Sequence, residues 1–165
     1  MKRLNKTLVA IVIALSFCGL AQAEIDAGDN QPVPDLRWLT GQGEEQHLYA
    51  IQNKAKVLHF WASWCIPCRE EMPELIQWQK ENPDIVVLAL SLDQKIAQTN
   101  HFIKKNKLDM PALLLNEEDS NALAVPVVPY TLFVSADNRL LGTYPGIAPW
   151  LESSFSGSVR ELLSK

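Results

Sequence analysis

Apolar runs alternate with amphipathic stretches along most of the chain. Two largely apolar runs, one from Val57 to Trp61 and one from Ile85 to Leu90, predict strands at 56–61 and 85–90 that are buried on both faces. Between them, residues from Cys65 to about Lys80 carry apolar side chains at helical spacing, and Asn82-Pro83 ends the pattern. Two such strands joined by a helix are expected to be parallel. The pattern therefore predicts an α/β fold built on a central sheet.

The flanking segments add strands and helices to this sheet. Short runs predict two hairpins, one of residues 36–39 and 44–49 around a glycine turn, the other of residues 130–134 and 140–144 around Asp137-Asn138. Helices are predicted at about 94–106, 119–124 and 150–163, and a short strand at 111–115. Asp119 is the expected cap of the second of these helices, and Gly157 weakens the third.

The first 23 residues predict a signal peptide. A basic start precedes an apolar stretch from Leu8 to Ala21, and Ala21-Gln22-Ala23 has the small-residue pattern of a cleavage site. This apolar stretch has 14 residues, fewer than the roughly 20 that a membrane-spanning helix needs. Its length therefore favours a cleaved signal peptide over an uncleaved membrane anchor. Residues 24–35, acidic and proline-containing, predict an extended lead-in. Residues 36–165 then form one domain.

Charge and cysteine content narrow the class of function. Without residues 1–23 the chain has 12 basic and 19 acidic residues, a net charge of −7. An acidic protein without a basic stripe is a poor binder of nucleic acid. Only Cys65 and Cys68 remain, a single close pair rather than the several disulfides of a cross-linked exported scaffold. A bridge over so short a loop adds little stability, so the pair predicts redox chemistry.

The pair lies where the strand at 56–61 gives way to the helix. Cys65 is thereby placed at the helix N-terminus, where backbone N–H groups favour a thiolate, and it is the predicted nucleophile. Cys68, one turn further on, is the predicted resolving partner and should be the more buried. Pro67 has no backbone N–H, which limits stabilisation of the thiolate and favours a reductant.

The stretch from Phe60 to Pro73 contains Phe60-Trp61-Ala62, Trp64, Cys65-Ile66-Pro67-Cys68, Glu71 and Pro73. In these residues it resembles the active site of the thioredoxin superfamily, in its periplasmic TlpA/ResA/DsbE-like branch. The similarity extends from about Pro34 to the C-terminus. It implies a thioredoxin-like three-layer fold with an N-terminal β-hairpin. It also implies a periplasmic thiol:disulfide oxidoreductase that reduces substrate proteins, cytochrome c maturation being one candidate process, and draws electrons from a membrane-bound thiol donor. The exchange needs no bound cofactor or metal, and a monomer is expected.

Further residues join the predicted site. Glu71 shares a helical face with Cys68, where burial would raise its pKa and let it exchange a proton with a thiol; in the resembling family a glutamate here tunes the dithiol. The alternative is a solvated glutamate like Glu70. Val128-Pro129 matches the cis-proline loop that faces the cysteines, although Pro126 competes, and the Val128 backbone could pair with a substrate strand. Residues expected to contact substrate are Trp64, Ile66, Pro67, Val128 and Pro129. Those expected only to pack are Trp38, Trp61, Trp78 and Trp150.

His59 departs from the family pattern, and two rival functions stay open. It lies six residues before Cys65, where thioredoxins usually carry aspartate and TlpA-like proteins often asparagine. It is either a proton acceptor beneath the site or a core histidine with one hydrogen bond. A disulfide-introducing oxidase would need a strongly stabilised Cys65 thiolate. A copper-handling protein would use both cysteines and a histidine, yet nothing places His47 or His101 near them.

Overall fold

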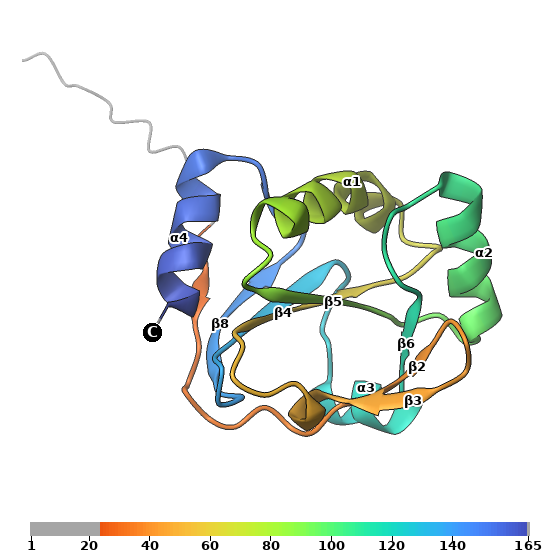
Figure 1. The fold of residues 1–165 in the computed structure, drawn as a ribbon, viewed down its shortest axis with the longest axis horizontal. Coiled ribbons are helices and arrows are strands. Elements are labelled where there is room, and N and C mark those ends of the chain that lie inside the picture. The colour runs from red at the N-terminus through yellow and green to blue at the C-terminus, as the bar shows by residue number, and fades with distance from the viewer. Residues whose placement is uncertain (1–23, 165) are drawn as a thin grey trace, which may run out of the picture.

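A mixed sheet runs through the protein, and helices cover both of its faces (Figure 1). The computed structural model describes residues 24–164, so the predicted signal peptide lies outside the described residues. The strands are β1 (Asp26–Ala27), β2 (Arg37–Thr40), β3 (Glu45–His47), β4 (Lys56–Trp61), β5 (Val86–Ser91), β6 (Leu113–Leu115), β7 (Tyr130–Val134) and β8 (Leu140–Pro145). The helices are α1 (Ile66–Glu81), α2 (Ile96–Asn106), α3 (Glu117–Leu123), α4 (Ser153–Leu163) and the 3-10 helix η1 (Leu48–Ala50).

The eight strands follow the order β1-β8-β7-β4-β5-β6-β2-β3. Strand β4 lies at the centre and is buried along its whole length. It pairs in parallel with β5, as predicted from the intervening helix, and antiparallel with β7. This register places His59 opposite Ala89 on one side and Thr131 on the other. None of the helices in residues 24–164 has the length and apolar character needed to cross a membrane.

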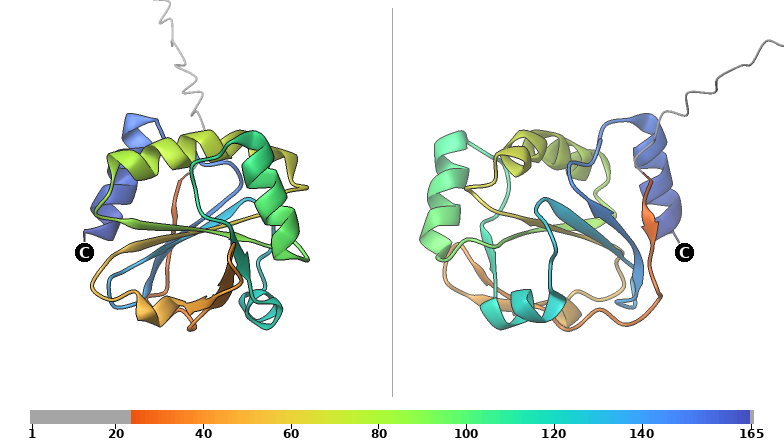
Figure 2. Two further views of the ribbon diagram at one scale, coloured as in Figure 1. Left: turned by 45° about the vertical axis from the view of Figure 1, so that its right-hand side comes forward. Right: turned by 180° about the vertical axis from the view of Figure 1, so that it is seen from behind.

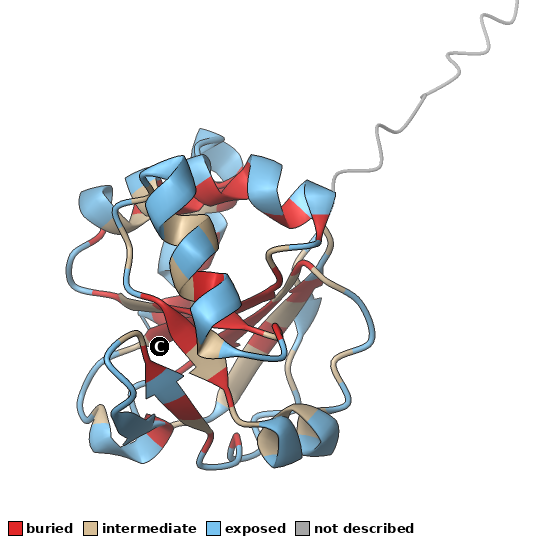
Figure 3. Ribbon diagram, turned by 90° about the vertical axis from the view of Figure 1, so that its right-hand side faces the viewer, coloured by how far each residue is buried: buried red, intermediate tan, exposed pale blue. Residues whose placement is uncertain are grey.

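Each face of the sheet has its own hydrophobic core. Helices α1 and α4 cover one face, with α2 beside them, while α3 and η1 lie on the other (Figure 2). Side chains of β4 alternate between the two cores: Val57 and Trp61 face α1, whereas Leu58 and Phe60 face away from it. Burial is concentrated in the strands and the inner helix faces (Figure 3). The α/β, thioredoxin-like fold with its N-terminal hairpin is confirmed.

The four tryptophans predicted to pack are all buried. Trp61, Trp78 and Trp150 belong to the core under α1 and α4, and Trp38 belongs to the opposite core. Trp78 and Trp150 lie against one another, with ring centroids 5.3 Å apart.

Two helix starts differ from the prediction. Asn116, not Asp119, caps α3: its side-chain oxygen accepts from the N–H of Glu118 at 2.9 Å. Asp119 lies in the first turn of the helix, where its carboxylate accepts three hydrogen bonds from Arg37 of β2. Helix α4 starts at Ser153 rather than at Trp150, because the segment before it forms turns that bury the Trp150 side chain.

The lead-in at 24–35 lies along the edge of the sheet. Asp26 and Ala27 pair antiparallel with Thr143 and Gly142 of β8. Gly28 follows immediately, and a Cβ there would clash with the backbone carbonyl of Leu140, so the close approach of these two segments requires glycine.

Gly157 offers a stabilising substitution. It lies inside α4, and a Cβ built there meets no atom within 4 Å. Gly157→Ala is therefore expected to raise the free energy of unfolding by about 1 kcal/mol in urea titrations, because alanine restricts the unfolded chain and favours helix. The matched control is Gly146→Ala, at a position with equal space but a φ of +85°, which should destabilise. A destabilised Gly157→Ala variant would contradict the expectation.

Candidate functional site

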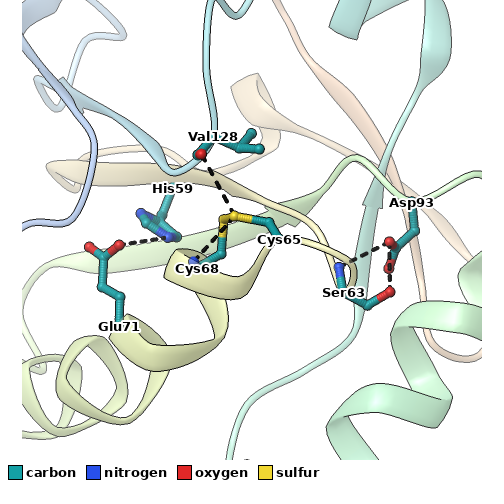
Figure 4. Close-up of a disulfide and its surroundings, with 7 residues drawn as sticks. All are labelled: His59, Ser63, Cys65, Cys68, Glu71, Asp93 and Val128. Carbon is teal, nitrogen blue, oxygen red and sulfur yellow. Dashed lines mark hydrogen bonds and ion pairs between the residues drawn. A yellow bond between two sulfur atoms is a disulfide. The ribbon is translucent and has the colours of Figure 1, made fainter.

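Cys65 and Cys68 form a disulfide where β4 passes into α1 (Figure 4). The sulfur atoms are 2.06 Å apart and the Cα atoms 5.3 Å apart. Cys65 occupies the N-cap position of α1, and Cys68 lies in its first turn. Cys68 is fully buried and Cys65 is 5% exposed, which matches the predicted order of burial. A partner can therefore reach the sulfur of Cys65 before that of Cys68.

Cys65 Sγ has one backbone donor among the described residues. The N–H of Cys68 points at it over 3.2 Å, so the sulfur caps the helix. Pro67, between the two cysteines, has no N–H to add a second hydrogen bond. A thiolate at this position would gain from the helix N-terminus and from one hydrogen bond.

The loop before β7 lies against the disulfide. The peptide bond between Val128 and Pro129 is cis, so the structure selects Pro129 and not Pro126 for this loop. The carbonyl oxygen of Val128 lies 3.7 Å from Cys65 Sγ. An extended segment of another protein could pair with this backbone while its own sulfur lies close to Cys65.

Apolar side chains are exposed around the disulfide. Trp64 is 65% exposed and Ile66 is 64% exposed, on either side of Cys65. Val127 adjoins Val128, and Ile147 follows Gly146, whose N–H donates to the Pro129 carbonyl; both side chains are also exposed. We call these four residues the apolar rim. Large exposed apolar side chains that are close together commonly mark a contact surface. Pro67 is exposed beside the rim, whereas Pro129 is buried.

Glu71 is buried in the core next to the disulfide, whereas its neighbour Glu70 is exposed. Its Oε1 accepts hydrogen bonds from the Ala148 N–H at 3.0 Å and from Trp150 Nε1 at 2.6 Å. Burial raises the pKa of Glu71 to about 7, and these two hydrogen bonds offset part of the increase. The buried alternative is therefore correct, and the carboxyl is poised to change protonation near neutral pH.

His59 is fully buried between β7 and α1. Its Nδ1 lies 3.0 Å from Thr131 Oγ1, and its Nε2 lies 3.9 Å from Glu71 Oε2 (Figure 4). Neither Nε2 nor Oε2 has a hydrogen-bond partner within residues 24–164. Burial lowers the pKa of His59 to about 3, so the imidazole is neutral at physiological pH. The structure thus has the single hydrogen bond of a core histidine and also directs its other nitrogen towards Glu71.

Two contributions to the site were missed from the sequence. Asp93 accepts hydrogen bonds from the backbone and hydroxyl of Ser63 and from the Thr99 hydroxyl, which fixes the loop before Cys65. The indole of Trp150, predicted only to pack, donates to Glu71. Nothing in the sequence pairs residues so far apart, although a buried indole N–H calls for some acceptor.

No group of three or more His, Cys, Asp or Glu side chains in the described part of the chain could hold a metal ion. His47, one of the histidines considered for copper, instead pairs with Asp35 at 2.9 Å.

Known proteins resemble this chain in sequence. The model of the AhpC/TSA family matches residues 30–140. Sporulation thiol-disulfide oxidoreductase A of Bacillus subtilis is 34% identical over 125 residues, which cover 67% of this chain and 72% of that protein. Thioredoxin-like protein YneN of the same organism is 33% identical over 106 residues, 62% of each chain. Thiol-disulfide oxidoreductase ResA of Bacillus thuringiensis is 26% identical over 160 residues, 86% of this chain and 89% of that one.

Solved structures show the same fold. A thiol:disulfide interchange protein of the thioredoxin family from Chlorobium tepidum superposes with a TM-score of 0.68 and 18% identity, covering 88% of this chain and 100% of that one.

Proposed function

The chain belongs to the AhpC/TSA family and is a thiol:disulfide oxidoreductase of the ResA type, and from this premise we propose that it reduces disulfides of exported substrate proteins through Cys65 and Cys68. One observation carries the proposal: the only cysteine pair in residues 24–164 lies at a helix N-terminus, beneath an apolar rim and 3.7 Å from the Val128 carbonyl. Cys65 keeps a small accessible area at which a partner can approach, whereas Cys68 is fully buried.

The substrate docks at the rim and at the cis-proline loop. Trp64 and Ile66 offer apolar contact on either side of the nucleophile, and the Val128 backbone offers hydrogen bonds to an extended segment. Pro67 and Pro129 hold these two surfaces in shape. Recognition through backbone and apolar contacts fits a protein that accepts several substrates.

Exchange proceeds in two steps. The Cys65 thiolate attacks one sulfur of the substrate disulfide, and the other substrate sulfur leaves as a thiolate, which takes a proton from solvent. The Cys68 thiolate then attacks the Cys65 sulfur of the mixed disulfide. The second substrate sulfur leaves, and the Cys65–Cys68 disulfide forms. Two electrons pass to the substrate, and a membrane-bound thiol donor restores the dithiol.

The reductive direction rests on the weak stabilisation of the Cys65 thiolate. A single N–H donor and a proline between the cysteines favour the disulfide over the thiolate more than a loop with two donors would. We further propose that the N-terminal signal exports the protein to the periplasm. There it acts as a monomer and takes part in cytochrome c maturation.

A redox equilibrium tests the direction. The mature protein is incubated with glutathione mixtures of graded ratio, and free Cys65 and Cys68 are counted by alkylation. A reduction potential near roughly −270 mV is expected for a reductase, whereas one near roughly −120 mV would identify the rival oxidase. The absence of any reversible transition would contradict the proposed thiol–disulfide exchange.

A further inference from the structure

We propose that His59 and Glu71 act as one buried proton-holding pair, in which His59 positions and stabilises the Glu71 carboxylate so that the pair takes the proton lost by Cys68. The inference rests on the proposed function and deepens it. His59 would be a positioning residue, because it acts on the thiol through Glu71.

Within residues 24–164, each of the two side chains has one polar atom without a hydrogen-bond partner, which we call its open atom, and the two open atoms face each other. His59 Nε2 and Glu71 Oε2 are both buried, both without a hydrogen-bond partner among the described residues, and 3.9 Å apart. The other polar atom of each side chain is held: Nδ1 by Thr131 and Oε1 by Ala148 and Trp150. A shift of about 1 Å would bring the open atoms to ordinary hydrogen-bond distance. Buried polar atoms are costly to leave unpaired, so each provides the other's partner.

One proton lies between the two open atoms in either charge state of the pair. When Glu71 is ionised, a neutral His59 can carry its hydrogen on Nε2 and donate it to the carboxylate, while Nδ1 accepts from the Thr131 hydroxyl. When Glu71 is protonated, the tautomer reverses: Nδ1–H donates to Thr131, and Nε2 accepts from the carboxyl. The pair therefore gains or loses one proton without leaving either atom unpaired. An apolar side chain at this position could not do this.

Few other charged groups in residues 24–164 act on the pair. Cys68 and Glu74 share its helix, and Glu74 raises the pKa of Glu71 further. Burial raises the pKa of Tyr144 on β8, and the charge of Glu71 raises it further, so the phenol stays protonated. Thr131 and Trp150, on β7 and the loop before α4, carry no charge. Lys56 is the first residue of β4, the strand that carries His59. Its Nζ lies near the carbonyl oxygens of Ser135 and Ala136 and not near the pair.

The proton balance places the pair in the second step of exchange. Cys68 must lose its proton before it attacks the Cys65 sulfur of the mixed disulfide. Cys68 and Glu71 lie three residues apart on α1 and so share a face of the helix. The ionised pair accepts the Cys68 proton and becomes neutral. As the Cys65–Cys68 disulfide forms, the second substrate sulfur leaves and takes a proton from solvent. The pair returns its proton when the disulfide is next reduced.

Stopped-flow reaction of the reduced protein with the aromatic disulfide DTNB separates the two steps. Attack by Cys65 releases one thionitrobenzoate, and resolution by Cys68 releases a second. In the wild type the rate of the second phase should rise through an inflection near pH 7, about the pKa of Glu71. In His59→Phe the carboxylate loses its donor, so the inflection should move up by about one pH unit, which lowers the second-phase rate at pH 7 about fivefold.

Further variants distinguish loss of the His59–Glu71 interaction from a general loss of structure. Glu71→Gln should remove the inflection, and the double variant should behave as Glu71→Gln alone, because His59 acts only through the carboxylate. His47→Gln, at an exposed histidine paired with Asp35, is the control and should leave the profile unchanged. An unmoved inflection in His59→Phe, or effects that add in the double variant, would overturn the pairing. A wild type that releases only one thionitrobenzoate would instead reject the proposed function.

A second measurement does not depend on the folding of His59→Phe. In wild-type protein labelled with ¹⁵N-histidine, the ring nitrogens of His59 should exchange tautomeric character through the same midpoint as the second phase. The change should vanish in Glu71→Gln. Ring shifts that stay constant across that pH range would reject the pair.

Discussion

Cys65→Ser is expected to lower the rate of exchange with a protein disulfide to less than about one-thousandth of the wild-type rate, because it removes the nucleophile of the first step. Cys68→Ser should behave differently. Cys65 remains at the N-cap of α1 beneath the apolar rim and can still attack, but the mixed disulfide cannot be resolved from within the protein. The first variant is therefore inactive, and the second is expected to accumulate covalent partners.

The two variants are compared by non-reducing gels and mass spectrometry after acid quench and alkylation. Cys68→Ser should yield adducts that dithiothreitol releases, whereas Cys65→Ser should yield few or none. Both serine variants lose the disulfide, so each controls for the stability of the other. Equal adduct levels in the two variants would mean that Cys68 also attacks substrate, against its complete burial.

Trp150→Ala is expected to reduce the free energy of unfolding by about 3 to 5 kcal/mol, the usual cost of truncating a buried large aromatic residue. The indole is fully buried, and its ring packs against Trp78, Phe155 and Phe133. Its truncation opens a cavity between α1 and α4. It also removes the 2.6 Å hydrogen bond to Glu71, which leaves a buried carboxyl with fewer donors.

Urea unfolding monitored by circular dichroism measures this effect. The matched control is Trp64→Ala, which removes the same side chain from a position that is 65% exposed. Its free energy of unfolding should change by less than about 0.5 kcal/mol, whereas its rate with a protein disulfide should fall through loss of the apolar rim. Similar losses of stability in the two variants would contradict the burial described for Trp150.

The sequence predicts the fold well where local patterns decide it. The predicted bounds of β4 match the observed ones, because a largely apolar run that lacks alternation and leads into a helical pattern has few other solutions. The cap of α3 was misassigned because Asn116 and Asp119 both have capping side chains, and the choice depended on Arg37, which is distant in sequence. The start of α4 depended on Trp150 turning inward, which is likewise a tertiary effect.

The site is predictable in its reactive atoms and less so in their surroundings. Spacing places Cys65 at a helix terminus and Glu71 on the face of Cys68, and the structure has both features. Asp93, thirty residues after Ser63, could not be linked to the loop it fixes, because hydrogen bonds between distant segments leave no periodic signal. His59 shows the same limit: its place on the central strand follows from the sequence, but the approach of its Nε2 to Glu71 Oε2 does not, because the two residues lie on different elements.

The two ends of the sheet bear on how the protein behaves when many copies are crowded together. One edge is closed by β1, which is only two residues long, and the other ends in β3, whose residues Glu45, Gln46 and His47 are all exposed and polar. Short or polar edges give the backbone of a neighbouring copy little to pair with. The described fold therefore resists edge-to-edge aggregation, a useful property for a protein whose working surface must itself remain apolar and open.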